Sequence, residues 1–203
     1  MGVYIFDTDV LVRAISEDAK RDTAHDFGKN IILDLVSTGR VFAHSFSESN
    51  SSREVYWRDI GQLDAFWQCH MDLLEDVPPL DLHDMSWPIR GYHEPSAFLS
   101  GSGDGVTNDC IVSGGCRFID CSLSKSVFSH NVVVERNASV ERSVGMERVQ
   151  IGAGARIRNA IIDKDVIVPA GARVGFDLDA DRAQFRVTNG GITVIPKGYV
   201  IQK

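Results

Sequence analysis

The sequence predicts an α/β segment followed by a left-handed parallel β-helix of hexapeptide-type repeats. The first observation behind this prediction is a period of seventeen residues, because equal steps from Leu123 reach Val140, Ile157 and Val174. A helix repeats near 3.6 residues and a strand near 2, so neither explains so long a period. Three short strands in each coil, with coil stacked on coil, do explain it.

The second observation is that other apolar columns keep the same step. Each period divides into segments of six, five and six residues, and each segment begins with an apolar residue. The columns are Val134, Ile151, Val168; Phe128, Gly145, Ile162, with one glycine exception; Ala138, Ala155, Ala172; Val127, Val144, Ile161, Leu178; and Val132, Val149, Val166. We expect these side chains to fill the interior of a triangular prism.

The third observation concerns the corners between strands. Asp120, Asn137, Gly154 and Gly171 recur at the same step. These residue types accept a positive φ or form local hydrogen bonds in turns. They therefore predict the corners of successive coils.

The first half alternates predicted strands and helices. We expect strands at 2–6 and 41–44, and helices at 9–19, 26–37 and 63–74. The second of these helices should bury the apolar residues Phe27, Ile31, Ile32, Leu35 and Val36. Parallel strands need neighbours on both sides, and this region has too few strands to supply them. It is therefore expected to be part of a larger α/β domain.

Proline and glycine mark the expected boundaries. Pro78 and Pro79 end the helix at 63–74, so we expect the first domain to cover 1–76 and a linker to cover 77–105. The β-helix domain should then occupy 106–203. A closing hairpin, from Phe185 to Ile201 over Asn189-Gly190-Gly191, should cap its last coil.

Composition narrows the class of protein. The chain has 203 residues and a net charge of −7, which disfavours a general role in binding nucleic acid or membrane surfaces. No apolar run approaches the length of a membrane-spanning helix, and the first residues lack a signal-peptide pattern, so we expect a soluble cytoplasmic protein. The spacing of the four cysteines fits no zinc site, and we expect small, buried, reduced thiols.

Several motifs together resemble bacterial glucose-1-phosphate adenylyltransferase (ADP-glucose pyrophosphorylase). They cover essentially the whole chain and occur in the order of that family. The motifs are Met1-Gly2-Val3-Tyr4-Ile5-Phe6, His25-Asp26-Phe27-Gly28-Lys29, Tyr56-Trp57-Arg58-Asp59-Ile60-Gly61, Trp87-Pro88-Ile89-Arg90 and Val112-Ser113-Gly114-Gly115-Cys116.

The resemblance implies a nucleotidyltransferase (Rossmann-like) domain followed by a left-handed β-helix, in a cytoplasmic homotetramer. It implies the synthesis of ADP-glucose and pyrophosphate from ATP and glucose 1-phosphate with Mg²⁺, in glycogen biosynthesis. The family's ATP-phosphate loop, first metal-binding aspartate and sugar-phosphate lysine would precede the first residue of this chain. We therefore expect the latter half of such an enzyme, inactive on its own.

Asp59 is the candidate catalytic residue and Mg²⁺ ligand. Nucleotidyl transfer passes through a highly anionic transition state, whose charge a carboxylate-bound Mg²⁺ offsets. By resemblance, Asp59 is the second carboxylate of the metal-binding pair. The residues alone also allow a purely structural role, as the N-cap of the helix that follows.

The resemblance assigns a second group of residues to glucose 1-phosphate. Asp26, at a helix start, would bond sugar hydroxyls, although its position is also that of an ordinary N-cap. The aromatic residues of the group would contact the sugar, or else pack in the core. The residues assigned to the substrate are Gly2, Tyr4, Asp26, Phe27, Lys29 and Trp57.

Two lysines of the second half resemble basic positions that bind phosphorylated metabolite effectors in the family. They are Lys164 and Lys197. A lysine is a suitable point charge for a phosphate, but most surface lysines are simply solvated.

Two other functions compete with this interpretation. The chain would be a non-catalytic oligomerisation or regulatory module if it associates with full-length subunits. Hexapeptide acyltransferases share the β-helix and use a histidine as general base, for which His130 is the candidate. Fold alone does not decide between them.

Overall fold

The computed structural model describes residues 2–4, 8–38, 43–45, 56–85, 88, 91, 94–100 and 107–201; for 2–4, 8, 38 and 43–45 it describes the backbone alone. Two compact units divide between Val55 and Tyr56, and each is described by itself. Among the described residues, no helix is long and apolar enough to cross a membrane.

The first unit contains a strand pair and a helical region. Strand β1 (Gly2–Tyr4) pairs with β2 (Ala43–Ser45) in antiparallel register, which differs from the parallel pairing expected of an α/β domain. The helical segments are α1 (Thr8–Asp18), the π-helix η1 (Phe27–Ile32) and α2 (Leu33–Thr38). The residues Ile5 and Phe6, which were expected to extend the first strand, lie outside the described residues.

The predicted helix at 26–37 is helical, but it is not one regular α-helix. Ile31 and Leu35 are buried as expected, whereas Phe27 is 43% exposed and Val36 is 54% exposed, so their predicted burial was wrong. A π-helix bonds i to i+5, which changes the angle between successive side chains. Phe27 is the first residue of η1, whereas Ile31 lies within it and is buried.

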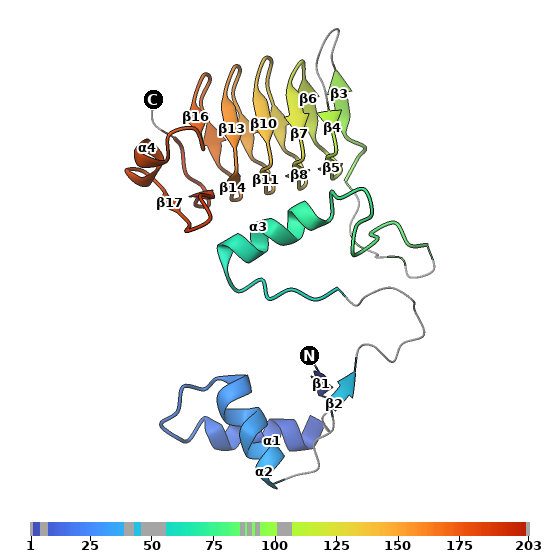
Figure 1. The fold of residues 1–203 in the computed structure, drawn as a ribbon, viewed down its shortest axis with the longest axis vertical. Coiled ribbons are helices and arrows are strands. Elements are labelled where there is room, and N and C mark those ends of the chain that lie inside the picture. The colour runs from blue at the N-terminus through green and yellow to red at the C-terminus, as the bar shows by residue number, and fades with distance from the viewer. Residues whose placement is uncertain are drawn as a thin grey trace. The chain divides into compact units, whose positions relative to one another are not determined.

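The second unit is a parallel β-solenoid with three faces (Figure 1). The first face contains β4 (Thr107–Asn108), β7 (Ser122–Ser124), β10 (Ser139–Glu141), β13 (Arg156–Arg158) and β16 (Arg173–Val174). The second face contains β5 (Ile111–Val112), β8 (Val127–Phe128), β11 (Val144–Gly145), β14 (Ala160–Ile162), β18 (Thr193–Ile195) and β17 (Arg186–Val187). The third face contains β3 (Phe98–Ser100), β6 (Arg117–Ile119), β9 (Val133–Val134), β12 (Gln150–Ile151) and β15 (Ile167–Val168).

The strand register confirms the predicted period. Leu123 pairs with Val140, Val140 with Ile157, and Ile157 with Val174. Each of these four side chains is at most 1% exposed. Burying one such side chain contributes about 1.5–3 kcal/mol, so one interior ladder supplies a large share of the stability of the coil stack.

The predicted corners are confirmed as well. Asp120, Asn137, Gly154 and Gly171 have φ values of 42°, 57°, 68° and 74°, the left-handed region expected at a tight corner. The glycine exception in the second column also has a cause. A Cβ at Gly145 would lie 3.1 Å from the Phe128 ring, which occupies that interior space from the preceding coil.

The two ends of the solenoid differ from the expectations in detail. Strand β3 already pairs with β6, so the coils begin at Phe98, ahead of the expected 106. Leu178 starts the short helix α4 (Leu178–Arg182), and Val194 takes its predicted place beside Ile161. The closing hairpin forms between β17 and β18, which pair in antiparallel register.

Helix α3 (Leu63–Asp72) packs on the second face of the solenoid (Figure 1). Trp67 and Met71 form a buried cluster with Val144 and Ile161. The Trp67 indole Nε1 donates to the Arg142 carbonyl at 2.8 Å, and the Arg142 guanidinium lies 4.9 Å from the Trp67 ring centroid. This helix, which the sequence groups with residues 1–76, therefore shares a compact unit with the solenoid.

All four cysteines are free thiols, but the expected burial holds only for Cys116 and Cys121. Cys116 and Cys121 are buried in the solenoid core, while Cys69 and Cys110 are half-buried. Burial raises the pKa of each thiol, which keeps it protonated and poorly reactive.

Candidate functional site

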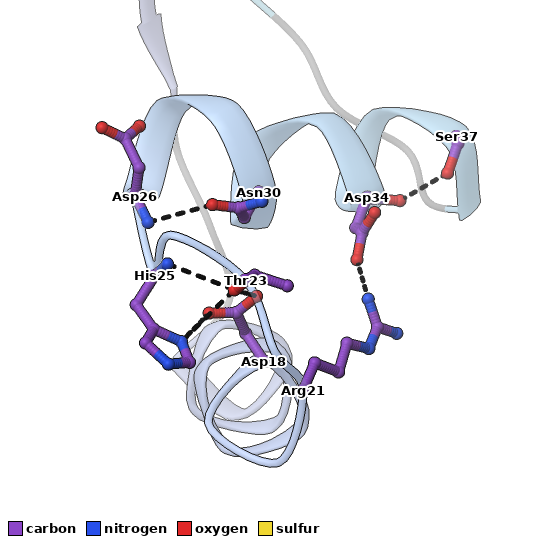
Figure 2. A network of polar contacts seen from close by, with 8 residues as sticks. All are labelled: Asp18, Arg21, Thr23, His25, Asp26, Asn30, Asp34 and Ser37. Atoms are coloured by element: carbon purple, nitrogen blue, oxygen red, sulfur yellow. Dashed lines mark hydrogen bonds and ion pairs between the residues drawn. The ribbon is translucent and has the colours of Figure 1, made fainter.

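The substrate candidates of the first unit lie at the start of η1. Asp26 is the N-cap residue, and its Oδ1 accepts a hydrogen bond from the Lys29 backbone N–H at 2.8 Å. Its own N–H donates to Asn30 Oδ1 at 3.0 Å (Figure 2). These bonds satisfy donors that a helix start leaves without partners. The predicted N-cap role of Asp26 is thus confirmed. Phe27 and Lys29, next to it, are both exposed.

A polar cluster beside this helix start was missed by the sequence analysis. Asp18, buried to 5% exposure, accepts from Thr23 Oγ1 at 2.9 Å and lies 2.8 Å from His25 Nδ1 (Figure 2). The hydrogen bond to His25 lowers the pKa of the Asp18 carboxyl, against the opposing effect of desolvation. An ion pair between Arg21 and Asp34 links the turn after α1 to α2. No periodicity marks these residues in the sequence.

Gly2 and Tyr4 lie in β1, where they pair with Ser45 and Ala43. Their backbone alone is described, so their predicted contact with the sugar stays a prediction.

The segment before α3 is attached to that helix through Asp72. Its Oδ2 accepts from the Tyr56 hydroxyl at 2.9 Å and from Arg58, and its Oδ1 accepts from Gln68 Nε2 at 2.9 Å. Burial alone would raise the pKa of Asp72, but the hydrogen bonds from Gln68, Tyr56 and Arg58 outweigh it and lower the pKa. The residues on both sides of Trp57 are therefore held, while the Trp57 side chain is 51% exposed.

Asp59, on the same segment, is exposed and forms a local turn. Its Oδ1 accepts from the Gly61 N–H at 2.9 Å, an Asx-turn. The N-cap of α3 is Gln62, so the structural alternative of Asp59 as that N-cap was wrong. A Cβ at Gly61 would lie 3.1 Å from Asp59 Oδ1, so a larger residue would crowd this turn.

The fit of these residues to Mg²⁺ can be tested by their ligand chemistry. Mg²⁺ requires near-octahedral oxygen coordination and is usually held by one or two carboxylates together with substrate phosphates and water. The described part of the chain contains no group of three or more histidines, cysteines or acidic residues that could hold a metal. Asp59 offers one carboxylate, so the described residues do not form a Mg²⁺ site by themselves.

The two effector candidates lie in consecutive turns of one solenoid corner. The Gly198 N–H donates to the Lys164 carbonyl at 2.8 Å, which places Lys197 beside Lys164 along the coil stack. The Lys164 Nζ lies 3.5 Å from Glu147 Oε2. Lys164 also lines a cavity of about 230 Å³ between the second face and His70 of α3. Lys197 is exposed.

The acyltransferase candidate lacks an orienting partner. His130 lies in the turn between β8 and β9, and its Nδ1 is a buried atom without a hydrogen-bond partner among the described residues. A histidine that acts as general base is normally held by a hydrogen bond on its second ring nitrogen. This geometry does not favour an acyltransferase.

Comparisons with known proteins find matches for both parts of the chain. Residues 1–76 match the family of nucleotidyl transferases, and residues 95–195 match the GlmU-like C-terminal hexapeptide family. A glucose-1-phosphate adenylyltransferase of Pasteurella multocida is 37% identical over 204 residues, which cover 96% of this chain and 46% of that relative. This chain is a homologue of glucose-1-phosphate adenylyltransferase.

Other glucose-1-phosphate adenylyltransferases are similar to this chain over a comparable length. The protein of Bradyrhizobium diazoefficiens is 40% identical over 98% of this chain and 50% of its own length. That of Arthrobacter sp. is 41% identical over 99% of this chain and 46% of its own length. The homologue described here thus spans about half the length of the relatives it matches.

Proposed function

We propose that this chain is the sugar-phosphate-binding and β-helix part of a glucose-1-phosphate adenylyltransferase of glycogen biosynthesis. The complete enzyme would form ADP-glucose and pyrophosphate from ATP and glucose 1-phosphate. The observation that carries the proposal is the similarity to such enzymes over 96% to 99% of the chain. The part that matches nucleotidyl transferases precedes the part that matches the hexapeptide family.

We assign contacts with glucose 1-phosphate to Asp26, Phe27, Lys29, Gly2 and Tyr4, and by resemblance also to Trp57. Exposure supports this assignment for the aromatic residues, since Phe27 is 43% and Trp57 is 51% exposed. An aromatic face left open to solvent suits the apolar face of a sugar ring, whereas a core residue would be covered. Asp26 supplies a carboxylate that accepts hydrogen bonds from sugar hydroxyls.

We assign Asp59 one coordination position on Mg²⁺. The remaining positions need ligands that the described residues do not supply. For that reason we expect the 203-residue chain alone to release no pyrophosphate from ATP and glucose 1-phosphate.

The solenoid would serve assembly and regulation. Lys164 and Lys197, in adjacent turns, would bind the phosphate of a metabolite effector, and the cavity beside Lys164 and His70 supports this. Glu147, which lies 3.5 Å from the Lys164 Nζ, would have to give up this contact to the ligand. A homotetramer in the cytoplasm is the expected assembly.

The experiment is calorimetric titration of the purified 203-residue chain with glucose 1-phosphate. We expect measurable binding, weakened about tenfold by Asp26→Ala through loss of a charge-assisted hydrogen bond. Asp22→Ala removes an exposed aspartate of the same unit and should leave the affinity within about twofold. Absence of binding at about 10 mM, or equal losses in both variants, would contradict the sugar-binding assignment.

Co-purification with a full-length adenylyltransferase tests the alternative. A chain that binds no glucose 1-phosphate but joins such a partner stably would be a non-catalytic oligomerisation module. A chain that binds the sugar phosphate without a partner supports the proposal above.

A further inference from the structure

Three arginines gather on the outer surface of the first face, near the end of the coil stack. Strands β13 and β16 pair Arg156 with Arg173, and the residue after each of these points into the core. Because side chains alternate along a strand, Arg156, Arg158 and Arg173 face outward. The guanidinium carbons of Arg158 and Arg173 lie 4.4 and 5.1 Å from the ring centroid of Phe176.

The backbone around this group is fixed. Arg158 Nε donates to the Gly175 carbonyl at 2.9 Å, and the Gly175 N–H donates to Asp181 Oδ2 at 2.7 Å. Asp181 is 4% exposed and also accepts from Thr193 Oγ1 at 2.8 Å. The guanidinium of Arg158 is thus held by one hydrogen bond and one stacking contact before any ligand arrives, which reduces the entropy lost on binding.

A cavity of about 710 Å³ opens beside Phe176, at the end of the solenoid where Figure 1 shows β16 and α4. Its charged lining residues are Arg173, Asp177, Asp179, Asp181 and Arg182. This volume is in the range of small-molecule sites, about 300–1,000 Å³.

The carboxylates of this lining are already engaged by the protein. Asp177 accepts from the backbone N–H groups of Asp179 and Ala180, each at 3.1 Å. Asp179 pairs with Arg182 at 2.8 Å, and Asp181 has the two donors named above.

The two arginines that contact Phe176 differ from these carboxylates in their charged partners. Within the described ranges, neither Arg158 nor Arg173 forms an ion pair with a carboxylate. Two cationic groups thus share one aromatic ring without a neutralising partner, in a chain of net charge −7. Like charges placed together repel, and a bound anion would remove that repulsion.

We propose that this cavity binds a small phosphate-bearing ligand, with Arg173 as the phosphate donor of the lining and Phe176 as the platform that orients it. Arg158, which contacts Phe176 but does not line the cavity, adds positive charge beside this platform. A guanidinium presents a planar fork of N–H donors that matches two oxygens of a phosphate. The site is distinct from the sugar site assigned to Asp26 and from the Lys164 corner, and it does not depend on the proposed adenylyltransferase activity.

The test is titration of the full 203-residue chain with inorganic pyrophosphate, followed by calorimetry and by the arginine Nε–H resonances in nitrogen–proton correlation spectra. We expect a Kd below about 1 mM, an Nε–H shift for Arg158 and Arg173, and affinity about tenfold weaker in Arg173→Gln. Arg173→Lys keeps the charge but loses the planar set of N–H donors, so its affinity should lie between those of the wild-type chain and Arg173→Gln.

Arg156→Gln is the matched control, and Lys164→Gln separates this site from the phosphate-binding corner proposed for Lys164 and Lys197. Arg156 is the register neighbour of Arg173 but does not line the cavity, so its loss should change affinity by less than about twofold. No binding by the wild-type chain at about 10 mM would overturn the proposal. So would equal losses in Arg156→Gln and Arg173→Gln, which indicate diffuse surface charge, or a loss confined to Lys164→Gln, which places the anion at the other corner.

Discussion

The helical region of the first unit and the solenoid of the second bury their apolar side chains to very different extents. In the solenoid, Val149, Ile151 and Val166 are fully buried. In α1 and α2, Val12 and Val36 are 57% and 54% exposed. Both regions have apolar residues at the spacing of their own secondary structure. The solenoid covers its interior columns throughout, whereas the helical region covers Ile31 and Leu35 and leaves Val12 and Val36 exposed.

The reason for this difference is the repeat. Each coil presents the next with a partner of the same shape, so an interior side chain always meets the equivalent side chain one period along. The sequence of an amphipathic helix does not supply such a partner, because its apolar stripe must pack against an element from elsewhere in the chain. Periodicity therefore predicts which side chains are buried in the solenoid. In the helical region it predicts only which side chains share one side of a helix.

A charge placed in each region should give the largest contrast. Ile151→Asp buries a carboxylate among apolar side chains and should destabilise the solenoid by more than about 4 kcal/mol. Val36→Asp, at an exposed helix position, should cost less than about 1 kcal/mol. Hydrogen exchange measured by mass spectrometry resolves the two regions in one chain. Equal loss of protection in both variants would mean that Val36 has a cover in solution.

Two glycines of the solenoid should separate strain from crowding. Gly175 has φ of 83°, and a Cβ there would lie 1.8 Å from the Arg158 carbonyl oxygen. Gly154 has φ of 68° and open space around its Cβ position. Gly175→Ala should cost about 3 kcal/mol or more, and Gly154→Ala about 1–2 kcal/mol, measured by urea denaturation. Similar losses of stability in the two variants would show that the backbone around Gly175 moves to accommodate the added Cβ.

The smallest expected effect is an acid transition in the first unit. The pKa of Asp18 is lowered in the folded chain, so its contribution is fully present above the ordinary value of 3.8 and is lost as pH falls through the folded pKa. Protection of the end of α1 should therefore decrease below about pH 4. Asp18→Asn should show reduced protection already at pH 7. A wild-type chain equally protected at pH 3 and pH 7 would exclude this role.

The sequence predicts the solenoid in detail because its signal is repeated many times. The ladder of Val140 and the corner at Asn137 each have several equivalents, so one exception such as Gly145 does not obscure the pattern. The strand that begins at Phe98 was missed because it falls in the range assigned to the linker. Its register partner, Arg117, follows after nineteen residues instead of seventeen.

Contacts between elements were not predictable in the same way. The amphipathic pattern of α3 predicts that Trp67 and Met71 share a face, but it does not name the second face of the solenoid as their partner. The cluster of Asp18, Thr23 and His25 depends on the path of the chain after α1, including the φ of 52° at His25. Such a path has no periodic signature.

The Phe128 ring above Gly145 has a consequence for how such a coil stack can change over evolutionary time. One residue has taken volume that its neighbour one coil further on gives up. We therefore expect the summed size of adjacent side chains along an interior column to limit substitutions more than the identity of any one side chain. A shrinking substitution at one level would be tolerated best when the adjoining level grows by the same amount.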